Sequence, residues 1–299
     1  MNEECTHTRS AGSAVVPRGC HARPMDPTIA RKTWRTLEPV HGAIYFVPEA
    51  REEYASLGVD DRMCGYFVSR SAAMGAVPPE VVIATFFNFD PDLVRSSLDG
   101  VWERVTPAAI LDARVRAADR MIRRFAPDAI GSAELAEASG LARSVALAAC
   151  ERPEGRPLFA GHASLDWPDE PHLVLWHAQT LLREFRGDGH VSALTVEGLN
   201  GCEALVTHAA AGDVSAEILR ATRQRSGDDW LAAEERLRSI GWLDPDLAFT
   251  DLGRERRAWI EQRTDELAAA PYDAIGVVGC ERLRELVRPV SRAMRAAFG

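Results

Sequence analysis

Apolar residues recur at intervals of three and four through most of the chain, which is the spacing of one face of an α-helix. Glycine and proline interrupt this pattern and divide it into segments. Up to residue 151 the pattern predicts helices near 27–45, 48–57, 60–74, 78–88, 91–98, 106–125 and 132–150. Beyond residue 171 it predicts helices near 172–186, 189–198, 201–211, 215–224, 228–240 and 251–270. The pattern therefore predicts a mainly α-helical protein.

Two stretches of the chain lack this periodicity. Residues 152–171 contain four prolines and two glycines, which is typical of a linker. Residues 1–26 show no apolar face, and we interpret them as a disordered or non-native extension with the natural start at Met25. The sequence thus predicts a helical domain over 27–151, a linker over 152–171 and a second domain over 172–299.

The second domain has the order of elements found in a winged helix. The helix near 228–240 carries one apolar stripe, which begins at Trp230 and ends at Ile240. Two short apolar segments, 241–243 and 248–250, flank a polar turn directly after that helix. We expect these segments to pair as the wing and to be the only strands of the protein. The fold class predicted is a helical N-terminal domain followed by a winged-helix C-terminal domain.

Composition and charge narrow the classes of function. The 299 residues carry a formal net charge of −9, which argues against a surface devoted entirely to nucleic acid. Lys32 is the only lysine, so we expect neither Schiff-base chemistry nor a phosphate-loop lysine. The six cysteines include no Cys-x-x-Cys pair, and no secretory signal is evident. No apolar stretch is long enough to span a membrane. We therefore expect a cytoplasmic protein with reduced thiols and no membrane partner.

Three segments carry distinctive sequences, namely Phe67–Gly75, Ala84–Pro91 and Leu182–His190. In these segments the chain resembles an actinobacterial winged helix-turn-helix family, and the resemblance extends from Pro27 to the C-terminus. The chain departs from its relatives at Ala73–Gly75, where they favour Ala-Pro-Leu-Gly. The resemblance implies a DNA-binding regulator of transcription, and it implies no catalytic residues.

Arginines surround the third helix of the predicted winged helix and are candidates for contacts with DNA phosphates. They are Arg220, Arg223, Arg225, Arg236, Arg238, Arg254 and Arg257. The third helix itself carries four carboxylates and two arginines over 228–239, a balance that repels DNA. The alternative interpretation is that these arginines are solvated side chains on helix faces.

A second group of polar residues lies on or near apolar helix faces and is a candidate ligand site. It consists of Tyr66, Arg70, His177, Glu184, Arg186 and His190. An arginine on an apolar face needs an acidic partner, which for Arg70 is either a protein carboxylate or an anionic ligand. His177 and Glu184 are separated by about 10.5 Å along a helix, too far to share one metal ion. We predict no metal site, and we expect Arg70, His177, Glu184 and His190 to border one inter-domain cavity.

The sequence leaves three functions open. The first is a ligand-responsive winged-helix regulator whose partners are double-stranded DNA and a small polar or anionic ligand. The second is an enzyme that acts on a small molecule in the inter-domain cavity, and the third is an interaction module that does not bind DNA. No dinucleotide fingerprint or phosphate-binding loop identifies a cofactor, and association into a homodimer is left open.

Overall fold

The structure, a computed structural model, describes residues 24–212 and 214–298, so most of the predicted N-terminal extension lies outside the described residues. Between residues 24 and 151 the helices are α1 (Pro27–Gly42), α2 (Pro48–Ala55), α3 (Arg62–Ser71), α4 (Pro79–Phe86), α5 (Pro91–Leu98), α6 (Val101–Arg104), α7 (Pro107–Phe125) and α8 (Ala133–Cys150). Several begin directly after a side chain that accepts a hydrogen bond from the first turn. These capping residues are Asp26, Asp61, Asp90, Thr106 and Ser132.

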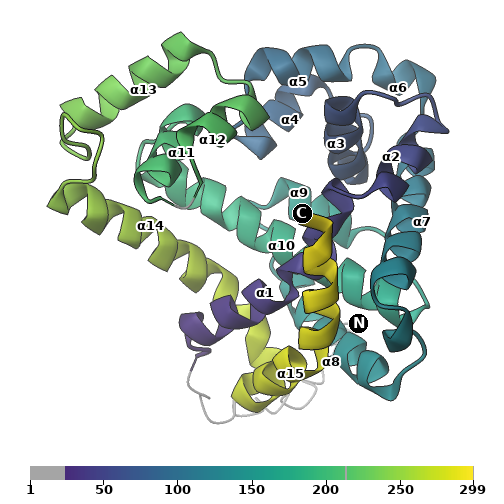
Figure 1. Cartoon of the computed structure of the whole chain (residues 1–299). Coiled ribbons are helices and arrows are strands. Elements are labelled where there is room, and N and C mark those ends of the chain that lie inside the picture. Colours follow the sequence, from purple (N-terminus) through teal and green to yellow (C-terminus); the bar gives the residue numbers. More distant parts are fainter. Residues whose placement is uncertain (1–23, 213, 299) are drawn as a thin grey trace, which may run out of the picture.

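The rest of the chain is also helical (Figure 1). Its helices are α9 (Pro157–Ala163), α10 (Pro171–Val196), α11 (Gly201–Ala210), α12 (Ala216–Arg223), α13 (Gly227–Ser239), α14 (Asp251–Ala269) and α15 (Gly276–Met294). Short 3-10 turns lie at Ala43–Tyr45, Ala72–Met74, Pro127–Ala129, Ala270–Ala274 and Arg295–Phe298. The prediction of a mainly α-helical protein is confirmed.

Helix α10 differs from the prediction of two helices separated at Gly187. It is one helix of 26 residues, and the backbone stays helical through Gly187 and Gly189. Residue 189 faces α14, because a Cβ there would lie 3.4 Å from the Cβ of Leu267, at ordinary contact distance. The predicted linker likewise contains α9, whose Leu158 and Phe159 are buried.

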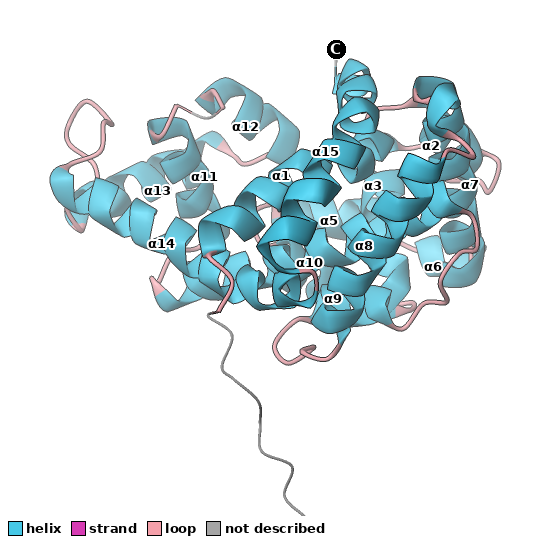
Figure 2. Cartoon of the chain, turned by 90° about the horizontal axis from the view of Figure 1, so that it is seen from below, coloured by secondary structure: helices cyan, strands magenta, loops and turns pink. Residues whose placement is uncertain are grey.

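Buried apolar residues form two clusters. The larger cluster draws on the helices before α10, on the first part of α10 and on α15, which packs against α1 and α8 (Figure 2). The smaller cluster draws on the end of α10 and on α11, α12, α13 and α14. Helix α10 therefore belongs to both clusters, and the last helix of the chain returns to the first one. The domain boundaries at residues 151 and 172 stay a prediction.

The smaller cluster contains a helix-turn-helix but no wing. Helices α12 and α13 are joined by residues 224–226, and α11 packs against both. After α13, a single antiparallel bridge joins Leu243 to Phe249, and the described residues contain no strand. The Asp244 carboxylate closes a tight turn by accepting the N–H groups of Asp246 and Ala248. The paired segment is short because α13 ends at Ser239 and α14 begins at Asp251. The prediction of a winged helix is therefore not supported.

Candidate functional site

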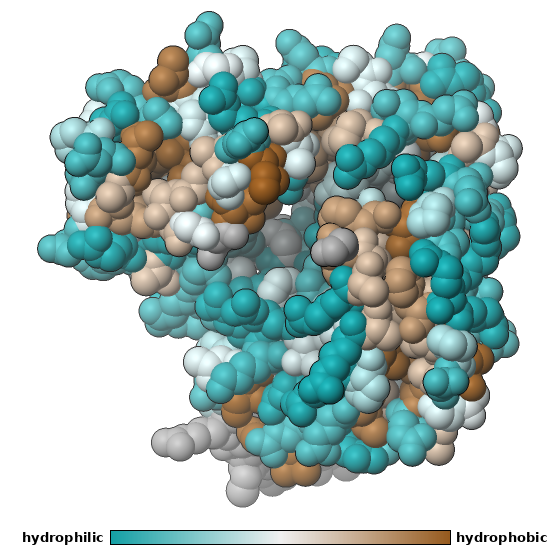
Figure 3. Space-filling model, viewed as in Figure 1, coloured by the Kyte–Doolittle hydropathy of each residue, from teal (hydrophilic) through white to brown (hydrophobic). Residues whose placement is uncertain are grey.

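A large cavity lies between the two clusters, at the central hollow seen in Figure 3. Its volume is about 1230 Å³, and residues of α1, α3, α10, α12 and α14 line it. Its arginines are Arg31, Arg35, Arg70, Arg183, Arg186, Arg223, Arg254 and Arg257, and its carboxylates are Glu38, Glu184, Asp188 and Glu261. The wall therefore has a formal excess of four positive charges in a chain whose net charge is −9. We call this space the arginine-lined cavity.

Arg70 and Glu184 form a buried ion pair on one wall of this cavity. The Nη2 atom of Arg70 donates to both carboxylate oxygens of Glu184, at 2.8 and 3.0 Å, and its Nη1 atom donates to the Tyr66 hydroxyl at 2.8 Å. Burial raises the pKa of Glu184, but Arg70 and Arg183 outweigh burial and hold that pKa at about 2. Of the two acidic partners considered for Arg70, a protein carboxylate and an anionic ligand, the structure provides the protein carboxylate, Glu184.

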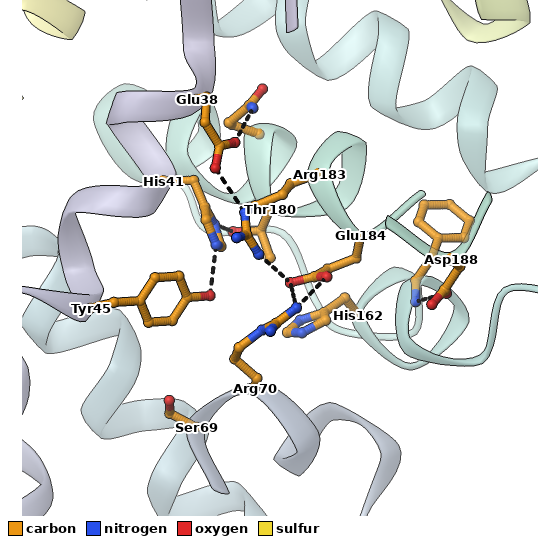
Figure 4. A network of polar contacts seen from close by, with 12 residues as sticks. Glu38, His41, Tyr45, Ser69, Arg70, His162, Thr180, Arg183, Glu184 and Asp188 are labelled. Carbon is orange, nitrogen blue, oxygen red and sulfur yellow. Dashed lines mark hydrogen bonds and ion pairs between the residues drawn. The ribbon is translucent and has the colours of Figure 1, made fainter. Parts of the chain in front are cut away.

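Arg183 lies beside this pair and is positioned by a buried polar network (Figure 4). Its Nε atom donates to Glu38 at 2.9 Å, and its guanidinium lies 5.5 Å from the centre of the Tyr45 ring. His41 links Tyr45 to Thr180, with both contacts at 2.8 Å. Burial and the charge of Arg183 lower the pKa of His41 well below its usual value, so the ring is neutral and can donate one of these hydrogen bonds and accept the other.

Arg223, at the end of α12, has no comparable partner. Among the described residues no carboxylate lies within ion-pairing distance of its guanidinium, whose one hydrogen bond goes to the Thr222 hydroxyl at 3.0 Å. The group lies 4.7 Å from the centre of the Phe89 ring, and its Nε atom is buried without a partner. Burial lowers the pKa of Arg223, and the charges of Arg70 and Arg183 lower it further. The cavity wall therefore contains a positive charge that no carboxylate of the described residues compensates.

Asp188 is the cavity carboxylate that titrates near neutral pH. Burial raises its pKa to about 7, although its Oδ2 atom accepts the backbone N–H of Phe159 at 3.0 Å. This contact ties α9 to α10. The Asp188 carboxylate therefore holds the start of α9 against the continuous helix α10.

Replacing Asp188 with asparagine is expected to change how stability depends on pH. An aspartate ionises near pH 4 in the unfolded chain but only near pH 7 in the folded protein, so its contribution to stability is lost as the pH rises between these values. Relative to wild type, the asparagine variant should therefore become steadily more stable from pH 4 to pH 7. Urea unfolding at four pH values measures this trend, and a constant difference between the two proteins would contradict it.

Five of the six residues predicted for the ligand site line the arginine-lined cavity, namely Tyr66, Arg70, Glu184, Arg186 and His190. Arg186 is paired with Asp265 at 2.7 Å, and His190 contacts the Thr264 hydroxyl at 2.9 Å. His177 is not among the lining residues. Its ring packs edge-on against Trp167, 4.9 Å away, and burial lowers its pKa to about 4. Of the four residues expected to border one cavity, Arg70, Glu184 and His190 do so, and His177 does not. His177 lies two helical turns before Glu184 on α10.

The predicted DNA-contacting arginines divide into two sets. Arg220 and Arg236 are exposed, while Arg238 is paired with Glu235 and Arg254 with Asp251. The other three are engaged inside the molecule. Arg257 is paired with Glu261, Arg223 lines the cavity, and the Nε atom of Arg225 donates to the Asn88 carbonyl at 3.2 Å.

Sequence reasoning missed three charged residues of α1 that line the cavity. Arg31, Arg35 and Glu38 lie on one face of this helix and all line the arginine-lined cavity. Their spacing of four and three residues was the available signal, because a charged stripe opposite an apolar one marks a face that meets water. In residues 24–212 and 214–298, no cluster of potential ligands could hold a metal ion. Within the same ranges, no helix has the length and hydropathy to cross a membrane.

Comparison with known protein families identifies one match that covers most of the chain. The sequence model of a helix-turn-helix family matches residues 30–299. No curated protein and no solved structure matches the chain. Nothing in these comparisons supports the enzyme alternative. Since the match spans both clusters and includes α12 and α13, this chain belongs to a helix-turn-helix family.

Proposed function

We propose that this protein is a transcriptional regulator that binds double-stranded DNA through α12 and α13, and that an anion in the arginine-lined cavity lowers its affinity for DNA. The observation that carries this proposal is the position of Arg223. This residue is the last of α12, at the turn of the helix-turn-helix, and its guanidinium lines the cavity. One side chain thus belongs to both the proposed DNA-binding unit and the proposed ligand site.

The junction between α12 and the first cluster supports coupling of the two sites. The carbonyl of Arg223 accepts the N–H of Asp90 at 3.0 Å, and Arg225 donates to Asn88. These contacts hold the turn of the helix-turn-helix against the loop between α4 and α5. An anion between Arg183 and Arg223 would relieve the repulsion between these charges and stabilise the docked turn. It would thereby withhold Arg223 and Arg225 from DNA phosphates.

The charges on and around α13 determine which surface of the helix-turn-helix can contact DNA. The helix is acidic in its first turn, with Asp228 and Asp229, and we therefore assign most of the affinity to phosphate contacts from its flanks. Arg220 on α12 and Arg236 on α13 are exposed and make no ion pair within the described part of the chain. Both are free to reach the DNA backbone.

The proposal predicts salt-dependent binding to DNA from the region upstream of the protein's own gene. In mobility-shift titrations, the logarithm of the affinity should fall linearly with the logarithm of the salt concentration. Arg220→Gln and Arg236→Gln should each weaken binding and reduce that slope by about one. Arg288→Gln, on the exposed face of α15, is the matched control and should bind as wild type does. Absence of salt-dependent binding at every concentration would refute the regulator proposal.

A further inference from the structure

A second cavity adjoins the arginine-lined one and has a different character. It has a volume of about 390 Å³, within the range of roughly 300–1,000 Å³ for small-molecule sites. Apolar side chains line most of it. They come from the N-terminal helices and the connections between them, from α12 and the segment before it, and from the C-terminal turn, and they include Phe46, Val59, Met63, Val214, Ile218 and Phe298. We call it the apolar cavity.

The rim of the apolar cavity exposes large apolar side chains to solvent. Ile218 on α12 is 55% exposed, Phe46 is 51% exposed, and the Phe46 ring lies 5.1 Å from that of Phe298. Figure 3 shows apolar side chains on both sides of the central hollow, over α12 and near the C-terminus. Side chains of this size that face one shared space gain free energy when an apolar group fills it.

The two cavities share part of their walls. Glu38, Tyr66, Phe89, Arg183 and Arg223 line both of them. Glu38 already compensates Arg183, at 2.9 Å, and Arg223 has no carboxylate partner among the described residues. The shared wall therefore carries one uncompensated positive charge beside an apolar space. This arrangement matches a molecule with one negative charge at one end and a hydrocarbon body at the other.

We infer that the ligand of this protein is an amphipathic monocarboxylate, whose carboxylate binds Arg223 at the shared wall and whose hydrocarbon chain occupies the apolar cavity. This inference rests on the proposed function, because it names the chemical class of the anion that the regulator senses. A guanidinium that no described carboxylate neutralises can donate a strong, charge-assisted hydrogen bond to the carboxylate of a ligand. The apolar cavity then provides affinity in proportion to chain length. Ile218, on the same helix as Arg223, brings the chain into contact with the helix-turn-helix.

Calorimetric titration of the full chain with straight-chain carboxylates tests the inference. From hexanoate to decanoate the affinity should rise by about fourfold per methylene, since each buried methylene contributes about 0.8 kcal/mol. Acetate should show no binding, and neither decanol nor decyltrimethylammonium should match decanoate. Equal binding of the cationic and anionic chains would contradict the inference.

Two variants separate the charged and apolar parts of the site. Arg223→Gln should weaken decanoate binding by about tenfold or more, because it removes a hydrogen bond to a charged group. Ile218→Gln alters a half-exposed rim residue, so it should fold normally, leave hexanoate binding nearly unchanged and reduce the gain from longer chains. Arg288→Gln is the matched control and should bind decanoate as wild type does. Decanoate binding that neither Arg223→Gln nor Ile218→Gln changes would place the ligand elsewhere and overturn the inference.

Mobility-shift assays with decanoate distinguish failure of this inference from failure of the proposed function. If decanoate releases DNA and Arg223→Gln prevents the release, both proposals are supported. If DNA is bound and released by small polar anions such as citrate, but not by decanoate, the amphipathic ligand is wrong and the regulator proposal stands. If decanoate binds as described and no DNA is bound, the ligand class stands and the regulator proposal fails.

Discussion

Glu184→Gln is expected to destabilise the folded protein by about 3–5 kcal/mol, because it removes the carboxylate from a buried ion pair and leaves charged arginines behind. The Glu184 side chain is only 2% exposed and contacts both Arg70, at 2.8 Å, and Arg183, at 3.4 Å. Glutamine has nearly the same shape, so the loss reflects charge rather than volume. Chemical unfolding monitored by circular dichroism at pH 7 measures the difference.

The chain offers a matched control for this variant. Glu137 makes a similar two-pronged contact with Arg282, at 2.7 and 2.8 Å, but both side chains are nearly half exposed. Glu137→Gln should therefore cost far less stability than Glu184→Gln, because solvent screens an exposed ion pair. Because the folded-state pKa of Glu184 is lowered to about 2, its contribution is present above pH 4.5 and is lost as the pH falls toward 2. Equal costs for the two variants at pH 7 would show that burial of Glu184 does not matter.

Gly201→Ala is expected to disrupt the attachment of the helix-turn-helix to the first cluster. A Cβ at residue 201 would lie 1.9 Å from the carbonyl oxygen of Phe87, a backbone atom that cannot rotate away. Phe87 already has a φ of 59°, a conformation that costs a bulky residue energy and that its surroundings hold in place. We expect a loss of at least about 3 kcal/mol, at the upper end of the cost of overpacking.

Hydrogen exchange and a control glycine check this expectation. Exchange should accelerate in α11, α12 and the loop between α4 and α5, while α7 and α8 stay protected. Gly140→Ala, inside α8, is the control, since a Cβ there meets no atom within 4 Å. That variant should be more stable than wild type by about 0.5–1 kcal/mol because alanine favours the helix. Unchanged exchange around α11 in Gly201→Ala would contradict the prediction.

Local signals in the sequence were sufficient for most helix starts. Pro27, Pro48, Pro79 and Pro91 each occupy the first turn of a helix, and their fixed φ angle suits that position. The same kind of reasoning failed inside α10, because Gly187 resembles a helix end when it is considered alone. Helix α10 packs along its length against α9, which precedes it, and against α14, which lies far away in the sequence. Tertiary packing thus overrode a local preference.

The candidate site was predictable only where one helix defines it. Arg70 was recognised because a charge on an apolar helix face requires a partner, and the structure supplies that partner in Glu184. His177 shares a face with Glu184 but lies two turns away beside Trp167, and periodicity carries no information on which neighbour covers each turn. The inward position of Arg223 depends on how α12 meets the loop between α4 and α5. No pattern within α12 encodes that meeting.

The continuity of α10 decides what kind of movement can connect the two sites. The helix is about 39 Å long, at 1.5 Å per residue over 26 residues, and both clusters pack on it. A continuous helix therefore connects the two clusters. Because α10 contains no break, it provides no hinge about which the helix-turn-helix could swing away from the first cluster. A signal from the ligand has to travel as shear, in which packed helices slide by an ångström or two over one another. Such a shift is large enough to decide whether two arginines face a cavity or a DNA backbone.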